Sequence, residues 1–352
     1  MVLPMAIDRR VWLAAKPRND RQVHLVAADL DARVSFRLDE IQSRNAVDGS
    51  ALPDWALYPA GVAWALAGEG FELQGFDAVY RSDLPAGAGL SSSAAVELAF
   101  AVLFQALSGW QMERMRMAQI CQRAENSYVG VNSGLMDQFA SAHGVGGHAL
   151  YFDALTLEWQ PLPLPSGCSV VVADSGVRRT LAGSAYNQRR AACEEAVRLL
   201  QKDLPNIRFL RDVSISDFTR LADNLPLETA LRARHVIDEI ERVRQACQAL
   251  DADDASAFGQ LMLAGHTSLR DLYQVSCAEL DVLVEIAAAL PGCYGARLTG
   301  AGFGGCTVNL VKTEVVPEFI SALTEQYKKR CGKDTCAFMC QASRGAYTQQ
   351  VS

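Results

Sequence analysis

The chain has 352 residues, of which 50% are hydrophobic, and carries a formal net charge of −7 at pH 7. A chain of this length can bury a large core and is expected to form two domains. The acidic balance argues against binding to nucleic acid through its phosphates, and no apolar run reaches the roughly 20 residues that span a bilayer.

The ten cysteines are scattered along the chain without a Cys-x-x-Cys pair, and the N-terminus shows no signal-peptide pattern. We therefore expect a cytoplasmic protein whose thiols stay reduced. Cys331, Cys336 and Cys340 form the tightest group, but no fourth ligand stands at a recognisable spacing, which argues against zinc.

The first elements are predicted to be strands. Short apolar or alternating runs at 11–15, 23–27 and 34–38 are separated by turn residues and predict a β-meander. A helix is expected over 54–67 with Asp54 as its N-cap, followed by a strand over 76–82.

That strand leads into the glycine-serine loop, Pro85–Ala95, which reads Pro-Ala-Gly-Ala-Gly-Leu-Ser-Ser-Ser-Ala-Ala. Glycines let a backbone approach an oxyanion closely, and a helix N-terminus offers unpaired N–H groups, so the loop fits a phosphate cradle. A serine-capped helix after an ordinary glycine turn remains the alternative. The loop matches neither a Walker A motif nor a dinucleotide fingerprint.

Helices are predicted over 92–107 and 111–126, and Gly134 is expected at a turn before a further helix. Asp137 falls in the first turn of that helix, where a carboxylate complements the helix dipole. Two β runs follow, over 147–153 and 155–162, and the prolines at 161–165 indicate a domain boundary.

The second half combines an apolar strand at 168–173, an Arg- and Glu-rich helix, and helices from about 226 to 289. His235 and His266 lie in apolar-periodic helices and are interpreted as structural. The glycine cluster, Gly295–Cys306, implies close backbone approach. A strand over 307–311, a helix, and two β runs over 335–339 and 345–351 complete an α+β layer.

Five ordered motifs together resemble the galactokinase family of the GHMP kinases, and the resemblance covers nearly the whole chain. It implies an α+β, two-domain GHMP-kinase-like fold with the active site between the domains, which would be residues 1–165 and 166–352. The motifs are the glycine-serine loop, Gly134–Phe139, Leu181–Arg190, Ser268–Asp271 with Val275–Asp281, and Leu298–Thr307.

By this resemblance the chain transfers the ATP γ-phosphoryl group to the C1 hydroxyl of D-galactose. Asp137 matches the general base, Ser93 and Glu125 match the Mg²⁺ ligands, and Gly134, Asp137 and Tyr186 match sugar contacts. The segment that matches the ATP contacts consists of Gly87, Ala88, Gly89, Leu90, Ser91, Ser92 and Ser93.

Members of the family carry a Pro-Gly-Arg-Val-Asn-Leu-Ile-Gly-Glu-His-Thr-Asp motif just before the stretch that opens this sequence. The motif supplies a phosphoryl-stabilising arginine, whose loss lowers rates by orders of magnitude. We therefore expect weak turnover from the sequence as given and restored turnover with an upstream in-frame segment. A non-catalytic sugar and ATP sensor and a kinase for N-acetylgalactosamine are the alternatives, and a monomer is expected.

Overall fold

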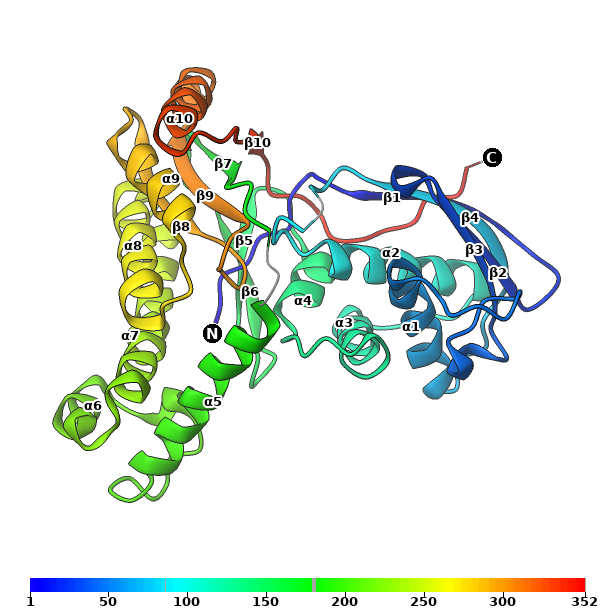
Figure 1. The fold of residues 1–352 in the computed structure, drawn as a ribbon, viewed down its shortest axis with the longest axis horizontal. Coiled ribbons are helices and arrows are strands. Elements are labelled where there is room, and N and C mark those ends of the chain that lie inside the picture. The colour runs from blue at the N-terminus through cyan, green and yellow to red at the C-terminus, as the bar shows by residue number, and fades with distance from the viewer. Residues whose placement is uncertain (86, 179–181, 352) are drawn as a thin grey trace. The chain divides into compact units, whose positions relative to one another are not determined.

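The computed structural model describes residues 1–85, 87–178 and 182–351 (Figure 1). The chain divides into two units. The N-terminal unit comprises Pro4–Ala86, Ser91–Trp159 and Ala342–Ser352. The C-terminal unit comprises Gln160–Gln341 together with Met1–Leu3 and Gly87–Leu90.

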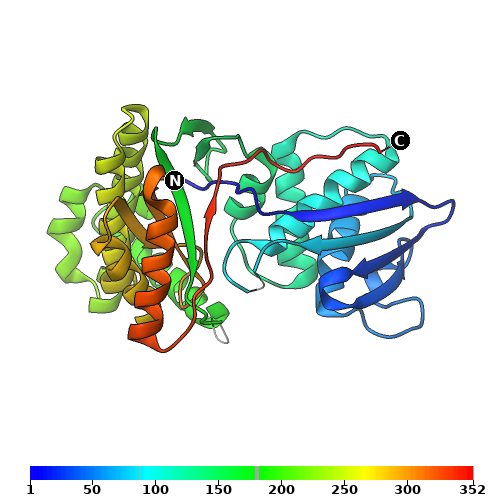
Figure 2. The ribbon, with the colours of Figure 1, turned by 90° about the horizontal axis from the view of Figure 1, so that it is seen from above.

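The N-terminal unit contains a four-stranded sheet, whose strands lie in one layer in Figure 2. Its order is β1-β4-β2-β3, with β4 antiparallel to β1 and parallel to β2. The predicted meander is therefore wrong, because the later strand inserts between the first two. The strands are β1 (Val11–Pro17), β2 (Gln22–Ala27), β3 (Ala32–Arg37) and β4 (Phe76–Ser82).

Helices of this unit cover the sheet through an aromatic core. Phe100 and Phe104 of α2 lie 6.2 Å and 5.2 Å from Phe76 of β4, measured between ring centroids. Pro53 rather than Asp54 is the N-cap of α1, and α3 begins three residues later than predicted, after Glu113 caps it. The helices are α1 (Asp54–Gly68), α2 (Ser92–Ser108), α3 (Arg114–Arg123), α4 (Met136–His143) and the π-helical turn η3 (Ala124–Val129).

The last residues of the chain run along the N-terminal unit, as the red trace in Figures 1 and 2 shows. The N–H of Gly345 donates to the carbonyl of Gly144 at 2.9 Å, and that of Ala346 to Ser141 at 2.8 Å. The strand predicted over 345–351 is wrong, because this backbone bonds to the end of α4 instead of to a sheet.

The strand predicted over 155–162 is shorter and begins later. Residues 154–156 form a turn, in which the Asp153 carboxylate accepts the N–H of Leu155 at 3.0 Å. The strands on either side of the turn are β5 (His148–Phe152) and β6 (Trp159–Pro163).

An antiparallel sheet of order β10-β7-β9-β8 forms the C-terminal unit with its helices. Side chains of α9 and α10, including Leu283 and Phe319, pack on β7, β8 and β9. Its strands are β7 (Cys168–Asp174), β8 (Cys293–Leu298), β9 (Cys306–Lys312) and β10 (Ala337–Cys340). Its helices are α5 (Ala182–Leu200), α6 (Ile215–Leu221), α7 (Leu227–Asp251), α8 (Ala255–Ser268), the π-helical turn η6 (Leu269–Tyr273), α9 (Ala278–Ala289) and α10 (Val316–Cys331).

Short 3-10 turns connect several elements, at Ala28–Leu30, Ile41–Ser43, Leu210–Asp212, Ala222–Asn224 and Thr313–Val315. Among the described residues, none of the helices combines the length and the apolar content that a membrane crossing needs.

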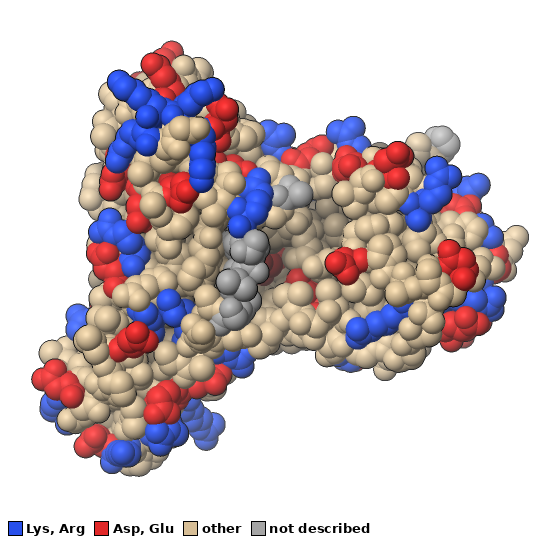
Figure 3. Space-filling view, in the orientation of Figure 1, with Lys and Arg blue, Asp and Glu red and all other residues tan. Residues whose placement is uncertain are grey.

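Charged side chains of both signs share the surface at the end of α10. Figure 3 shows basic side chains gathered there with acidic side chains among them. Lys328 pairs with Asp334 at 2.8 Å, and Arg330 with Glu285 at 2.6 Å. Two of the basic side chains in the last turn of the helix are thus paired with neighbouring carboxylates.

Two glycines allow α8 to lie directly on β8. A Cβ at Gly259 would stand 2.1 Å from the carbonyl oxygen of Tyr294, and a Cβ at Gly295 would stand 2.1 Å from that of Gly259. Real Cβ atoms do not approach backbone so closely, so any side chain here separates the helix from the strand.

We expect Gly259→Ala to lower the free energy of unfolding by about 1–3 kcal/mol, because the methyl group overpacks a backbone contact. Gly146→Ala is the control, since the nearest atom there is 4.0 Å away. Urea unfolding of both variants measures the difference, and equal stabilities would contradict the expectation.

Candidate active site

A buried cluster of carboxylates lies in the N-terminal unit. Glu97 on α2 and Gln138 on α4 are fully buried, and Glu125 in η3 is 4% exposed. The side-chain nitrogen of Gln138 donates to Oε2 of Glu97 at 3.0 Å and to Oε2 of Glu125 at 2.9 Å. We call Glu97, Glu125 and the Gln138 amide between them the carboxylate cluster.

Two predicted site residues adjoin this cluster. Ser93 lies four residues before Glu97 on α2, so the two side chains share one face of the helix. Asp137 precedes Gln138 in the first turn of α4, as predicted, and is half-buried. Residues predicted for the metal and for the base therefore lie next to members of the carboxylate cluster along their helices.

A π-helical turn places Glu125 there. The N–H of Gly130 donates to the carbonyl of Glu125 at 2.9 Å, which is the five-residue spacing of a π-helix, and the N–H of Val131 adds a second bond at 3.1 Å. Such turns are rare and concentrate at functional sites. Helical periodicity predicted an ordinary helix to 126 and missed this irregularity.

Ser133 ties the following loop to the carboxylate cluster. Its hydroxyl donates to Oε2 of Glu125, and its N–H donates to Oδ1 of Asn126 at 2.9 Å. The Gln122 amide donates to the Ser133 carbonyl at 3.1 Å. Gly134, a predicted sugar contact, comes next and is exposed, and a Cβ at this position would have no atom within 4 Å.

Burial first, and then the nearby charges of Glu125 and Asp137, raise the pKa of Glu97 to about 9 against the opposing bond from Gln138. Glu97 therefore holds a proton at neutral pH. This lets two carboxyl groups share one amide without carrying two negative charges.

The glycine-serine loop starts α2 without a serine cap. Gly87 and Gly89 have φ of 66° and 74°, and Ser91, the N-cap residue, has φ of 57°. The Ser91 side chain makes no capping bond, and within the described residues the hydroxyls of Ser91, Ser92 and Ser93 have no hydrogen-bond partner. Ala88 is buried and Leu90 half-buried, while Ala86 lies outside the described residues. This geometry leaves three hydroxyls available for a ligand.

Arg178, which no sequence motif singled out, lies against Gly87 in the C-terminal unit. A Cβ at Gly87 would stand 3.3 Å from Cδ of Arg178. Both terminal nitrogens of Arg178 donate to the Asp174 carboxylate, at 2.8 Å and 2.7 Å. Burial opposes ionisation of Asp174, but these bonds hold its pKa below the ordinary value. The signal available in the sequence is an Asp and an Arg four residues apart directly after a buried strand.

The glycine cluster supports the segment that carries Arg178. Gly300, Gly302, Gly304 and Gly305 all have positive φ. A Cβ at Gly302 would stand 2.1 Å from the Val275 carbonyl oxygen. The predicted close backbone approach is confirmed, and the approaching backbone is the protein's own.

Ser175 joins this cluster to the end of β7. Its N–H and its hydroxyl both donate to the carbonyl of Gly305, at 2.9 Å and 2.7 Å. In return the N–H of Gly305 donates to the carbonyl of Val177 at 3.1 Å. The residues directly before Arg178 are thereby fixed on both sides.

Tyr186, the remaining predicted sugar contact, lies half-buried on α5. Arg189, one turn later, donates to the carbonyl of Tyr273 at 2.7 Å and so anchors α5 to η6. Leu181 of the same sequence motif lies outside the described residues.

The two buried histidines hold helices in place. His235 shares a hydrogen bond of 2.8 Å with the Ser268 hydroxyl, and burial lowers its pKa to about 4. Nδ1 of His266 accepts the N–H of Leu298 at 3.3 Å. Both side chains are used in packing contacts, as their interpretation from sequence expected.

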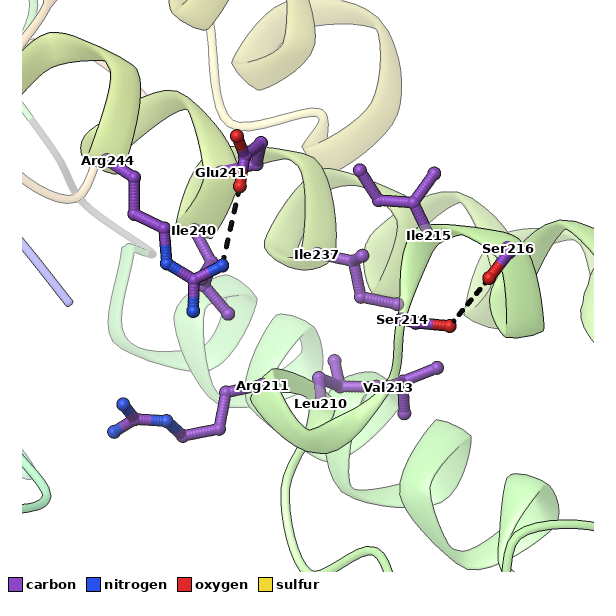
Figure 4. Close-up of a pocket in the computed structure, with 10 residues that line it drawn as sticks. All are labelled: Leu210, Arg211, Val213, Ser214, Ile215, Ser216, Ile237, Ile240, Glu241 and Arg244. Carbon is purple, nitrogen blue, oxygen red and sulfur yellow. Dashed lines mark hydrogen bonds and ion pairs between the residues drawn. The ribbon is translucent and has the colours of Figure 1, made fainter. Parts of the chain in front are cut away.

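A separate surface pocket of about 310 Å³ lies in the C-terminal unit (Figure 4). Its charged side chains include Arg244, which pairs with Glu241 at 3.4 Å, and its hydroxyls include Ser214 and Ser216, which bond to each other at 2.9 Å. The pocket contains none of the predicted site residues and is not part of the candidate site.

No group of three or more His, Cys, Asp or Glu side chains that could hold a metal ion occurs in residues 1–85, 87–178 and 182–351. A magnesium ion needs no such group when nucleotide phosphates and water supply most of its ligands. The oxygen-only set of Ser93 and Glu125 fits a hard cation of this kind, and Oε1 of Gln138 beside it is buried without a partner among the described residues.

We expect Glu97→Gln to stabilise the protein increasingly as the pH rises from about 5 to 9. The folded protein keeps the Glu97 proton up to about pH 9, whereas the unfolded chain loses it near 4.5. The stability of the unsubstituted protein therefore falls as the pH rises between these values, by up to about 1.4 kcal/mol per pH unit. Urea unfolding across this range measures the effect, with the exposed Glu194→Gln as control. Parallel stability curves for the two variants would contradict the expectation.

Family models match one segment in each half of the chain, and curated proteins match nearly its whole length. Residues 58–145 match the family model of the GHMP kinases N terminal domain, and residues 246–329 match that of the GHMP kinases C terminal region. Galactokinase of Chloroflexus aggregans is 46% identical over 344 residues, which cover 98% of this chain and 87% of the relative. Galactokinase of Fusobacterium nucleatum is 37% identical, covering 98% of this chain and 88% of the relative.

Solved structures of similar fold include another galactokinase. Lactococcus lactis galactokinase complexed with galactose superposes with a TM-score of 0.90 at 33% identity, covering 97% of this chain and 87% of that one. Methanococcus jannaschii mevalonate kinase has a TM-score of 0.68 at 19% identity, with 97% of this chain and 90% of that chain covered, which shows a shared fold.

Proposed function

This chain belongs to the galactokinase family of the GHMP kinases, and on that basis we propose that it transfers the γ-phosphoryl group of ATP to the C1 hydroxyl of D-galactose, giving α-D-galactose 1-phosphate. The observation that carries the proposal is the 46% identity to a galactokinase over 98% of the chain. The relatives favour neither a non-catalytic sensor nor a kinase for N-acetylgalactosamine.

Asp137 is the proposed general base and also a contact to the sugar. Its carboxylate takes the proton of the C1 hydroxyl as that oxygen attacks the γ-phosphorus, while the bond from this phosphorus to the β–γ bridging oxygen breaks and ADP leaves. The position in the first turn of α4, beside the buried Gln138, supports this role because the helix fixes the carboxylate. Gly134 and Tyr186 are proposed to contact the same sugar.

The glycine-serine loop is the proposed binding site for the ATP phosphates, through Gly87 to Ser93. Its positive-φ glycines and its three available hydroxyls support this role. Arg178 is proposed to bind a phosphate oxygen, because its guanidinium lies at the loop and Asp174 holds it in one orientation.

Ser93 and Glu125 are the proposed protein ligands of Mg²⁺. The ion, when bound with the nucleotide, supplies charge neutralisation for the phosphates. Glu125 is suited to this role because η3 fixes its backbone and two donors hold its Oε2 atom.

We propose a cytoplasmic location and a monomeric state, with galactose and ATP as small-molecule partners and neither nucleic acid nor membrane as a partner. The ten cysteines, all free thiols in the structure, suit a reducing compartment, in which ATP is also abundant.

ADP release tests the reaction. We expect it to depend on galactose and to be much weaker with glucose or N-acetylgalactosamine. The 352-residue chain is assayed with each of the three sugars. Galactose-dependent release supports the proposal, and its absence contradicts it.

Asp137→Asn is expected to reduce turnover by about 100- to 10,000-fold, because the amide cannot accept the hydroxyl proton. Its affinity for ADP should stay within about twofold of the unsubstituted value, since Asp137 is assigned to the sugar side. The exposed Asp48→Asn is the control. Undiminished turnover would remove Asp137 from the mechanism.

Arg178→Met is expected to weaken the binding of a fluorescent ADP analogue by about 10- to 100-fold, because a charge-assisted hydrogen bond to phosphate is lost. Arg198→Met on the exposed face of α5 is the matched control. Titrations in metal-free buffer compare the two variants, and equal affinities would exclude Arg178 from the phosphate site.

A further inference from the structure

We propose that Gln138 is the positioning residue of the cation site: its buried amide fixes Oε2 of Glu125 and so presents Oε1 of the same carboxylate to Mg²⁺. This inference rests on the proposed function, which assigns Glu125 to the metal. It adds a role for Gln138, which the motif Gly134–Phe139 contains without a role of its own, and for Glu97, which no sequence motif includes.

The hydrogen bonds of the carboxylate cluster have a clear direction. The amide nitrogen of Gln138 has two protons, and it donates to Glu125 at 2.9 Å and to Glu97 at 3.0 Å. Ser133 donates to the same Oε2 atom of Glu125. Within the described part of the chain, Oε1 of Glu125 accepts no hydrogen bond. One oxygen is therefore held and the other is left for a ligand.

Two further oxygens of the carboxylate cluster have no protein partner among the described residues. Oε1 of Glu97 and Oε1 of Gln138 are buried without a hydrogen-bond partner in the part of the chain that the structure describes. A buried polar atom left unpaired is destabilising, so native proteins retain one mainly where a ligand, a water or an ion satisfies it. Both residues are fully buried, so bulk solvent does not reach these oxygens.

The side chain at position 138 must donate a hydrogen bond to each of two carboxyl groups, and an amide does this. A glutamate there would place three carboxyl groups together, and a methionine of similar length would donate to neither. Glu97 orients the Gln138 amide by accepting a hydrogen bond from one of its N–H groups, so the second N–H points at Glu125. Gln138 also follows Asp137 directly, so α4 holds the proposed base and the support of the metal ligand in one turn.

The test measures how strongly Mg²⁺ improves nucleotide binding, which does not require turnover. The dissociation constant of a fluorescent ADP analogue is determined with a chelator and with saturating Mg²⁺. We expect Gln138→Met to reduce the Mg²⁺-dependent gain in affinity by about 10- to 100-fold, as loss of partners that orient metal ligands does elsewhere. The metal-free affinity should change by less than about twofold.

Gln122→Met is the matched control, because Gln122 also donates its amide to this region but bonds the Ser133 carbonyl and not a carboxylate. Its Mg²⁺-dependent gain should stay within about twofold of the unsubstituted value. An equal gain in Gln138→Met, or a parallel loss of affinity with and without Mg²⁺, would overturn the positioning role. Lack of any Mg²⁺-dependent gain in the unsubstituted chain would instead overturn the metal site on which this inference rests.

Glu97 provides a second test should Gln138→Met unfold. Glu97→Gln keeps a side-chain oxygen that accepts the Gln138 amide and should retain the Mg²⁺-dependent gain within about threefold. Glu97→Leu removes that acceptor and should reduce the gain about 10-fold or more. Equal gains in the two variants would contradict the orientation of Gln138 by Glu97.

Discussion

The candidate site depends on one amide group placed between two buried carboxyl groups. Taking a carboxylate out of water is unfavourable unless hydrogen bonds or a cation compensate for its lost hydration. Gln138 donates one N–H hydrogen bond to Glu97 and another to Glu125. Burial keeps Glu97 in its protonated form. The negative charge of the pair is thereby left on Glu125, the proposed ligand of Mg²⁺.

The surrounding fold serves to bring these three side chains together. Phe100 and Phe104 fix α2 on the sheet, and α2 carries Glu97 one turn beyond Ser93. The π-helical turn η3 turns Glu125 inward, at the energetic disadvantage that irregular helical hydrogen bonds carry. In the C-terminal unit, the glycine cluster performs a comparable task, because its tight packing fixes the segment that presents Arg178.

Much of this could be predicted from the sequence where local signals are strong. The helix after the glycine-serine loop and the position of Asp137 follow from periodicity and turn chemistry. The insertion of β4 into the sheet could not be foreseen, because strand order depends on long-range pairing. Arg178, and the role of Gln138 within its motif, were missed for the same reason: each gains meaning only from a loop or from carboxylates that are distant in sequence. The family resemblance supplied residue roles that spacing alone left open.

The most direct measurement is a crystal structure of the protein with Mg²⁺, a non-hydrolysable ATP analogue and galactose. The account predicts a cation bound to Oε1 of Glu125 and to the Ser93 hydroxyl, with the Gln138 amide still donating to Oε2. It also predicts the galactose C1 hydroxyl within hydrogen-bond distance of Asp137, and a nucleotide phosphate beside Arg178. A cation bound away from Glu125, or a Gln138 side chain that has left the carboxylates, would contradict it.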